Sequence, residues 1–332
     1  VLDDAFRDLC SQAFADVHVL WYPRQALRRA HVWQGLRLFA GFLSQLRAFR
    51  ADLAFNIEED SLSSRLTQLS GARFRLGCSP TRHRFGYDHV LPIDYGAYHR
   101  WHSFEAVFAA LGLADAAPEY INLHIDRADA VTIEKLHELC ISARERLVAI
   151  HPAATKDYKK WPESAFSALC NLLIENGYSP LLLGAGDIDA ARCTRIAKSV
   201  AGTEFARVHN LCNRLSLAEL AGLFLLCDGI VGNDSGPSHL ASAQGLPGVV
   251  IFGPSDPSIW GPLGVDSRVM RRVDQCDPRC SRRACFADYR CLQSIKPGEV
   301  LNALLALAPE RKPGHNFEQI LEHTTEQHRE TR

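Results

Sequence analysis

A short polar segment ending at His239 has the residue types and the spacing of a phosphate-binding turn. In VGNDSGPSH, apolar strand residues run directly into Asp234, Ser235 and Gly236, and helix-forming sequence follows at once. The first N–H groups of a helix have no partner within the helix, and the helix dipole places positive charge beside them. We therefore expect a phosphate at this junction, with Gly236 allowing close approach of the backbone. The alternatives are a simple N-cap at Asp234 or Ser235 and a core position for His239.

A second polar segment follows the apolar sequence LVAIH, which ends at His151. This segment, PAATKDYKKWP, carries Thr155, Lys159 and Lys160. A lysine beside a helix N-terminus stabilises the negative charge that grows on a departing diphosphate. On residue types alone, the alternative for the lysines is a solvated turn.

Alternating strand and helix patterns supply the elements that must position these residues. In the second half, strands are expected over 147–151, 180–184, 205–210, 229–232 and 247–252, with helices over 162–176, 188–200 and 237–244 and one opening at Ser216. In the first half, strands are expected over 17–21, 51–57, 73–77 and 89–92, and helices over 3–13, 32–49, 61–70 and 104–111. Such alternation predicts an α/β protein built of right-handed βαβ units on parallel sheets.

Length and composition agree with two globular domains. The chain has 332 residues, of which 47% are hydrophobic and 23% charged, and its net charge of −1 gives no bias towards nucleic acid. We place the domains at 1–135 and 136–310, with a polar tail at 311–332. No signal peptide or membrane-spanning run is expected, and 11 cysteines, among them Cys140, Cys170 and Cys227 in apolar contexts, favour a reducing cytoplasm.

Three motifs in register resemble glycosyltransferase family 9, the ADP-heptose:lipopolysaccharide heptosyltransferase family. The family pattern D-[ST]-G-x-x-H is matched at 234–239, and G-x-[ST]-D-P is matched at 253–257. The upstream H-P and K-x-W-P patterns are matched at 151–152 and 159–162, and looser similarity covers 51–57 and 70–77. The main resemblance spans 147–304.

The resemblance implies a GT-B fold of two Rossmann-like domains whose parallel sheets face a cleft. It implies an acceptor-binding domain at 1–135 and a nucleotide-sugar-binding domain at 136–310. It also implies inverting transfer of heptose from ADP-heptose to an anionic lipopolysaccharide inner-core acceptor, with no cofactor required for catalysis. The residues that would bind the donor are Thr155, Lys159, Asp234, Ser235, Gly236 and His239, with Leu215 near the adenine. His102, at a place where the family often has a histidine before a helix, would contact the acceptor or have only a structural capping role.

The proposed general base of the family departs from this pattern. Family members begin with a strand that ends in a Gly-Asp loop, and that Asp is the proposed base for the acceptor hydroxyl. This sequence opens at what we predict to be the following helix, so we expect the first strand to be missing and a gap in the sheet. Truncation and natural divergence both remain open. Asp3 and Asp4 are nearby candidates for the base, and residues 58–60 are a further acidic turn.

Two other clusters suggest partners. Arginines from Arg24 to Arg50 surround an apolar stripe that could approach an anionic glycolipid on the inner membrane face, or form an ordinary amphipathic helix on the sheet. Four thiols within sixteen residues could bind structural zinc or iron, or remain free or form a disulfide: Cys276, Cys280, Cys285 and Cys291.

Alternative functions rest on other residues. Gly184-Ala185-Gly186 would suggest a nicotinamide-dependent oxidoreductase, but the third glycine of that fingerprint is absent. Asp187 and Asp189 would suggest a metal-dependent transferase, although acids that open a helix are explained as caps. A sugar-nucleotide-binding homologue that is non-catalytic or impaired, and a heptosyltransferase with a protein acceptor, also remain open.

Overall fold

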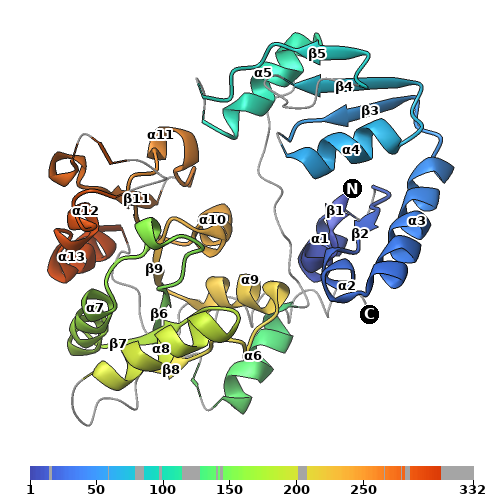
Figure 1. Cartoon of the computed structure of the whole chain (residues 1–332). Coiled ribbons are helices and arrows are strands. Elements are labelled where there is room, and N and C mark those ends of the chain that lie inside the picture. Colours follow the sequence, from blue (N-terminus) through green and yellow to red (C-terminus); the bar gives the residue numbers. More distant parts are fainter. Residues whose placement is uncertain are drawn as a thin grey trace. The chain divides into compact units, whose positions relative to one another are not determined.

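The chain folds into two compact units, 1–121 and 122–332, which are shown in a computed structural model (Figure 1). The structure describes residues 1–14, 17–58, 60–78, 86–96, 99–113, 128–139, 141–142, 145–200, 208–264, 266–277, 279–280 and 285–307. The predicted tail at 311–332 lies outside these residues. No described helix is long and apolar enough to cross a lipid bilayer.

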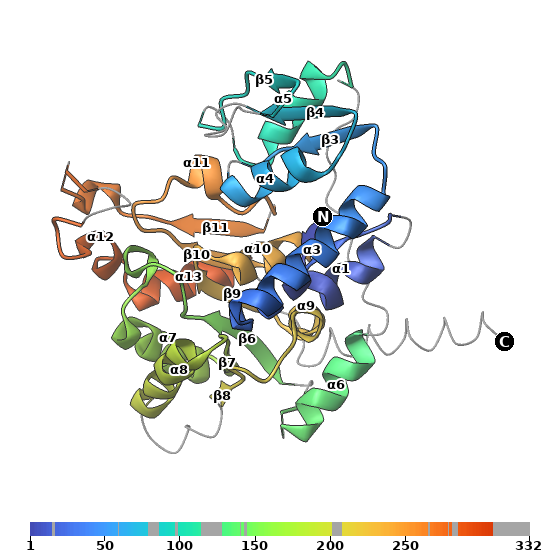
Figure 2. The ribbon, with the colours of Figure 1, turned by 45° about the vertical axis from the view of Figure 1, so that its right-hand side comes forward.

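The second unit contains a six-stranded parallel sheet (Figures 1 and 2). Its strands are β6 (Arg146–His151), β7 (Tyr178–Leu182), β8 (His209–Asn210), β9 (Gly229–Asn233), β10 (Gly248–Ile251) and β11 (Ser267–Met270). The spatial order is β11-β10-β9-β6-β7-β8, so the direction of winding reverses between β6 and β9. This order is the Rossmann arrangement, in which ligands bind at the reversal point beyond the carboxyl ends of the strands.

Helices cover both faces of this sheet because successive strand residues point to opposite sides. Val148, Ile150 and Val231 pack in one core with α7 (Glu163–Glu175), α8 (Asp187–Ser199) and α13 (Pro297–Leu307). Leu147, Ala149 and Ile230 pack in the other core with α6 (Ala128–Glu138), α9 (Leu217–Leu226) and α10 (Gly236–Ala243). The remaining short elements of this unit are η2 (Asp157–Lys159), α11 (Pro257–Trp260), η4 (Val273–Gln275) and α12 (Arg290–Gln293).

The first unit divides its strands between two parallel sheets. One sheet pairs β1 (Leu2–Asp3) with β2 (Trp21–Tyr22), and the other orders β3 (Leu53–Asn56), β4 (Phe74–Cys78) and β5 (His89–Leu91). The helical elements are η1 (Asp4–Phe6), α1 (Arg7–Ala13), α2 (Arg24–Arg29), α3 (Val32–Ala48), α4 (Ser61–Leu69) and α5 (His102–Ala110). A groove of about 500 Å³ is lined by Leu2 of the first sheet, Phe55 of the second and Leu20 just before β2, among others.

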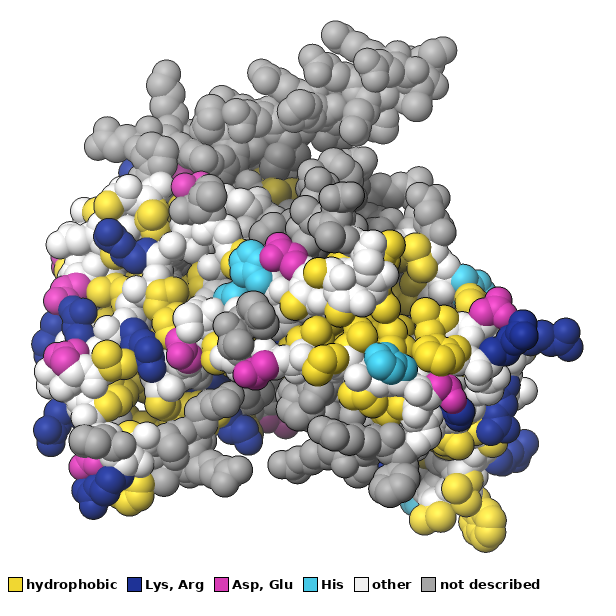
Figure 3. Space-filling model, turned by 90° about the horizontal axis from the view of Figure 1, so that it is seen from above, with side chains coloured by type: hydrophobic (Ala, Val, Ile, Leu, Met, Phe, Trp, Pro, Cys, Tyr) yellow, Lys and Arg dark blue, Asp and Glu magenta, His cyan; other side chains and the backbone are white. Residues whose placement is uncertain are grey.

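The structure differs from the sequence predictions near the chain start and at the boundary between the units. The predicted helix over 3–13 begins instead with β1 and η1, because Leu2 and Asp3 pair with Trp21 and Tyr22. Helix α6 was not predicted. Its residues 128–135 lie in the range placed in the first domain, but the helix belongs to the second unit, where Leu136 lies in the core beside α9. On the protein surface, exposed hydrophobic side chains lie beside Lys and Arg side chains (Figure 3).

Two of the predicted core cysteines are confirmed as buried residues. Cys170 is fully buried on α7, and its burial raises the pKa of the thiol to about 12. Cys227 is also buried, between α9 and β9. Cys140 lies outside the described residues.

Candidate functional site

A cavity of about 670 Å³ lies in the second unit at the reversal point of the sheet. Its wall includes His151 at the end of β6, the segment 153–155, the two lysines Lys159 and Lys160, and the first residues of α8 and α10. All six residues that we predicted to bind the donor line it: Thr155, Lys159, Asp234, Ser235, Gly236 and His239. The structure therefore brings together two segments that are about 80 residues apart in the sequence.

Asn233 at the end of β9 holds the two segments together. Its side chain is fully buried, and its Nδ2 donates to the carbonyl oxygens of Pro152, at 2.7 Å, and Ala153, at 3.4 Å. Its Oδ1 accepts from the backbone N–H of Trp161 at 3.0 Å. One amide thus fixes both ends of the loop that carries Lys159.

Lys159 and Asp234 form an ion pair within the cavity. The distance from Lys159 Nζ to Asp234 Oδ2 is 2.6 Å, and the two side chains are 22% and 4% exposed. Because so little solvent reaches the carboxylate, the pair is screened less than an ion pair on the surface. The ammonium group is therefore held in place while remaining on the cavity wall.

Ser235 is held by two polar contacts. Its Oγ lies 3.0 Å from Nδ1 of His151 and donates to the carbonyl oxygen of Asn233 at 3.0 Å. Burial lowers the pKa of His151 to about 4, so its imidazole is neutral at physiological pH. A neutral ring beside the hydroxyl adds no charge and restricts the orientation of the Ser235 side chain.

Two helix N-termini open onto the cavity. Helix α10 begins at Gly236, after an extended Ser235 with φ −159° and ψ 163°, and no side chain caps it. A Cβ built on Gly236 would meet no atom within 4 Å, so this position faces open space. Helix α8 begins at Asp187, after Gly186 in the left-handed region at φ 88°. Both helices direct the positive ends of their dipoles to the same cavity.

The motif at 253–257 has a structural role that supports the lysine loop. A Cβ on Gly253 would lie 2.1 Å from the carbonyl oxygen of Tyr158, so any larger residue would displace η2. Within the same motif, Asp256 caps α11 by accepting from the N–H of Ser258 at 2.9 Å. The glycine is thus required for the close packing that brings Lys159 to the cavity.

The residues predicted for the base and the acceptor lie in the first unit. Asp3 and His102 are engaged locally, whereas the buried Oδ1 of Asp4 has no hydrogen-bond partner among the described residues. Asp3 accepts from the N–H of Ala5 at 3.1 Å and pairs with Arg24 at 2.9 Å, while Asp4 lies in η1. His102 opens α5, and its Nδ1 lies 2.9 Å from Glu105 Oε2 on the same helix. A catalytic or acceptor-binding role for Asp3, Asp4 and His102 stays a prediction.

Other acidic residues serve as helix caps or make local ion pairs. Asp60 caps α4 through the N–H groups of Leu62 and Ser63, and Glu58 lies 3.4 Å from Arg100; residue 59 lies outside the described residues. Asp189 accepts from the N–H of Ala185 at 3.1 Å, but the N-cap of α8 is Gly186 and no side chain caps this helix, so Asp187 and Asp189 lie in its first turn and not at the predicted cap.

The cysteine cluster forms two pairs of thiols around α12. Cys291 is buried and hydrogen-bonds Cys276, and burial is the main cause that raises the pKa of Cys291 to about 12. Cys280 hydrogen-bonds Cys285, and the N–H of Phe286 donates to Cys280 Sγ at 3.2 Å and lowers the pKa of that thiol. Among the described residues no three or more Cys, His, Asp or Glu side chains converge on a metal position. As placed, the four thiols do not form a ligand set for zinc or iron, so a metal here stays a prediction.

The sequence did not identify the residues that position the cavity wall, as opposed to those predicted to contact the ligand. Asn233 and the contact of His151 with Ser235 were not identified, nor was the N-terminus of α8. The sequence does hold a signal for the first of these. An amide that directly follows the buried strand residues 229–232 must find partners for its polar atoms within the fold.

Comparison with known proteins agrees with this geometry. The sequence model of glycosyltransferase family 9 (heptosyltransferase) matches residues 40–289. Lipopolysaccharide heptosyltransferase 2 of Escherichia coli K12 is 29% identical over 172 residues, which cover 52% of this chain and 49% of that protein. The chain spans about half the length of this relative and of similar curated relatives.

Two solved structures share the fold of the chain. The glycosyl transferase family 9 protein from Veillonella parvula is 18% identical with a TM-score of 0.78, covering 92% of this chain and 87% of that one. The E. coli heptosyltransferase WaaC with ADP is 21% identical with a TM-score of 0.66, covering 92% and 89%. The fold is thus the GT-B type, with two Rossmann-like domains.

Proposed function

Because the chain belongs to glycosyltransferase family 9, we propose that it is an inverting transferase that moves heptose from ADP-heptose to a lipopolysaccharide inner-core acceptor. The observation that carries this proposal is the cavity at the reversal point of the sheet, where Lys159 and two helix N-termini converge. The relatives named as heptosyltransferases and the WaaC structure with ADP support the choice of donor and acceptor.

The donor's diphosphate occupies the N-terminal end of α10. The backbone N–H groups near Gly236 donate to phosphate oxygens, and Lys159, which lines the same cavity beside Asp234, contributes its ammonium group. When the glycosidic bond breaks, negative charge grows on the β-phosphate that leaves with ADP. Positive groups already fixed at that place stabilise the transition state more than the ground state.

Asp234 has a different role from the phosphate ligands. A carboxylate repels phosphate but accepts hydrogen bonds from sugar hydroxyls, so Asp234 orients the heptose while it positions Lys159 at 2.6 Å. Attack by the acceptor hydroxyl on the face opposite to ADP inverts the anomeric carbon, and a general base must accept the proton from that hydroxyl. No metal is required for the departure of ADP in this scheme.

The test is calorimetric titration with ADP and ADP-heptose, followed by mass spectrometry of the transfer product. Removal of a charged hydrogen bond costs about 1.5–3 kcal/mol, so Lys159→Met weakens both ligands by roughly 10- to 100-fold. Asp234→Asn weakens ADP-heptose more than ADP. Lys156→Met is the matched control, since Lys156 is an exposed lysine three residues from Lys159 that does not line the cavity.

The outcomes separate the competing functions. Binding of NADH in place of ADP would overturn the proposal in favour of an oxidoreductase. Tight ADP-heptose binding without transfer to a lipopolysaccharide core would identify a sugar-nucleotide-binding homologue, and transfer to a protein would change the acceptor class. If neither ADP nor ADP-heptose binds, the cavity is not a donor site.

A further inference from the structure

Helices α2 and α3 of the first unit form a basic surface. From Pro23 to Phe49 the sequence contains five arginines and no acidic residue. Arg24 pairs with Asp3 at 2.9 Å. Among the described residues no ion pair involves Arg28, Arg29 or Arg37. Three exposed guanidinium groups, two at the end of α2 and one on α3, thus remain available to an anionic partner.

An exposed apolar stripe runs beside these arginines on α3. Phe42 is the buried residue of this 17-residue helix, whereas Val32, Trp33 and Leu36 are 76%, 80% and 55% exposed. At about 100° per residue, Val32, Leu36 and Ala40 follow one line of the helix, and Trp33 lies beside it. Phe42 points about 120° away from the centre of that line. The helix therefore has two apolar faces, and the described part of the fold covers one of them.

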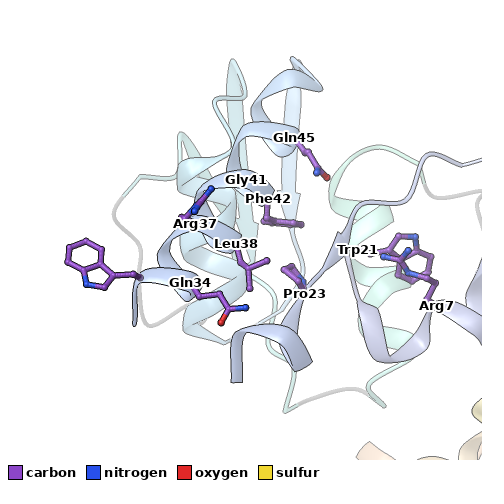
Figure 4. Close-up of a pocket in the computed structure, with 10 residues that line it drawn as sticks. Arg7, Trp21, Pro23, Gln34, Arg37, Leu38, Gly41, Phe42 and Gln45 are labelled. Carbon is purple, nitrogen blue, oxygen red and sulfur yellow. The ribbon is translucent and has the colours of Figure 1, made fainter. Parts of the chain in front are cut away.

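A cavity of about 650 Å³ adjoins the stripe and is lined by two cationic side chains, Arg7 and Arg37, but by no acidic one. Arg7 lies over the ring of Trp21 at 5.3 Å from its centroid. Figure 4 shows Leu38 and Phe42 directed from α3 towards Pro23. The cavity therefore combines apolar side chains with two arginines and the amides of Gln34 and Gln45, and a phosphate of a lipid headgroup fits this chemistry.

From these observations we infer that the surface made by Arg28, Arg29, Val32, Trp33, Leu36 and Arg37 docks onto an anionic lipid bilayer. A helix with arginines beside an apolar stripe lies in the interface plane of a membrane, and tryptophan favours the level of the headgroups. Nucleic acid would leave the apolar stripe exposed to water. A protein that bound this surface would need a groove that is both apolar and acidic, and no other feature of the described residues points to such a partner. The inference concerns the first unit and is independent of the donor cavity in the second.

The experiment measures flotation of the full chain with 100 nm vesicles of phosphatidylglycerol and phosphatidylethanolamine, compared with phosphatidylcholine vesicles. We expect binding to the anionic vesicles alone, and weaker binding as NaCl is raised. One basic residue near an anionic surface contributes about 1 kcal/mol, so the double change Arg28→Gln and Arg29→Gln lowers the partition coefficient by about 30-fold. Trp33→Ala is expected to lower it by roughly 10-fold.

Controls keep the result specific to this surface. Arg73→Gln removes an arginine whose side chain is 84% exposed in the same unit, and Leu113→Ser removes an exposed apolar residue; neither change alters binding. Trp33→Phe retains vesicle binding because the ring stays apolar. The variant loses the tryptophan fluorescence that brominated lipid quenches in the unchanged protein. Circular dichroism confirms that the variants fold, and ADP affinity in the second unit is unchanged.

Three results would overturn the inference. The first is equal binding to anionic and zwitterionic vesicles. The second is anionic-vesicle binding that survives both the double arginine change and Trp33→Ala. The third is Trp33-dependent self-association in analytical ultracentrifugation without vesicle binding, which would assign the stripe to contact between copies of the chain.

Discussion

Replacement of Asn233 by alanine tests whether one buried amide holds the donor cavity together. The change removes the acceptor for the Trp161 N–H at 3.0 Å and the donor to the Pro152 carbonyl at 2.7 Å. Both partners lie in buried surroundings, and a buried polar group left without a partner costs about 1–3 kcal/mol. For two such groups we expect a loss of about 2–6 kcal/mol in the unfolding free energy of the second unit.

Hydrogen exchange of the β6 and β9 amides measures this loss in the second unit alone, because the peptides that contain these strands report on that unit. Calorimetric titration with ADP then measures the effect on the cavity. We expect affinity to fall by at least 10-fold at a temperature where the variant is still folded, since the loop that carries Lys159 is no longer fixed at Pro152 and Trp161.

Ser238→Ala is the matched control. Ser238 is also buried and donates to the carbonyl oxygen of Asn233 at 2.8 Å, but Ser235 Oγ donates to the same oxygen at 3.0 Å. Its removal therefore costs only about 1 kcal/mol and leaves the lysine loop in place. The reasoning is refuted if Asn233→Ala destabilises the unit no more than Ser238→Ala, or if it leaves ADP affinity unchanged.

Three further predictions concern the surroundings of the cavity and the thiol cluster. Gly253→Ala places a Cβ 2.1 Å from the Tyr158 carbonyl oxygen, so we expect ADP affinity to fall by about 10-fold or more in titration, and an unchanged affinity would show that η2 can move freely. Burial lowers the pKa of His151 from 6.5 to about 4, so the unfolded chain binds a proton before the folded one does. The unfolding free energy should therefore fall by about 3 kcal/mol as pH drops from 6.5 to 4, and His151→Asn should remove this part of the pH dependence. Mass spectrometry measures the zinc and iron content of the purified protein. We expect a metal only if the two thiol pairs at 276–291 move to one common centre, and a metal content near zero per chain removes the metal hypothesis.

The strands of the second unit could be predicted closely because both of their faces are buried. The predicted strands over 147–151 and 229–232 agree within one residue with β6 and β9, since unbroken apolar runs are typical of a parallel sheet with helices on both sides. Strand β11 was not predicted, because its sequence SRVM is short and polar at the edge of the sheet. The start of the chain was predicted as helix, because the pairing of β1 with β2 depends on residues 19 positions away.

The candidate site was predictable where local sequence determines the chemistry. Gly236 after a strand, followed by a helix, predicts a phosphate site without any knowledge of the tertiary fold. Asn233 could not be assigned in this way, because its amide partners lie 72 and 81 residues away in the sequence. The same applies to α8, whose N-terminus reaches the cavity only because β7 lies next to β6.

The charges around the cavity explain why such distant elements are needed. Lys159 already has a partner in Asp234, so the pair adds no net charge for a diphosphate to meet. His151 is neutral, and Asp187 and Asp189 at the start of α8 are negative. Attraction for the diphosphate must then come mainly from the oriented N–H groups of α10, supported by the lysine. Such groups act only at short range and in fixed positions. The affinity of the cavity therefore depends on the packing of Asn233 and Gly253, which hold the lysine loop and the end of β9 against each other.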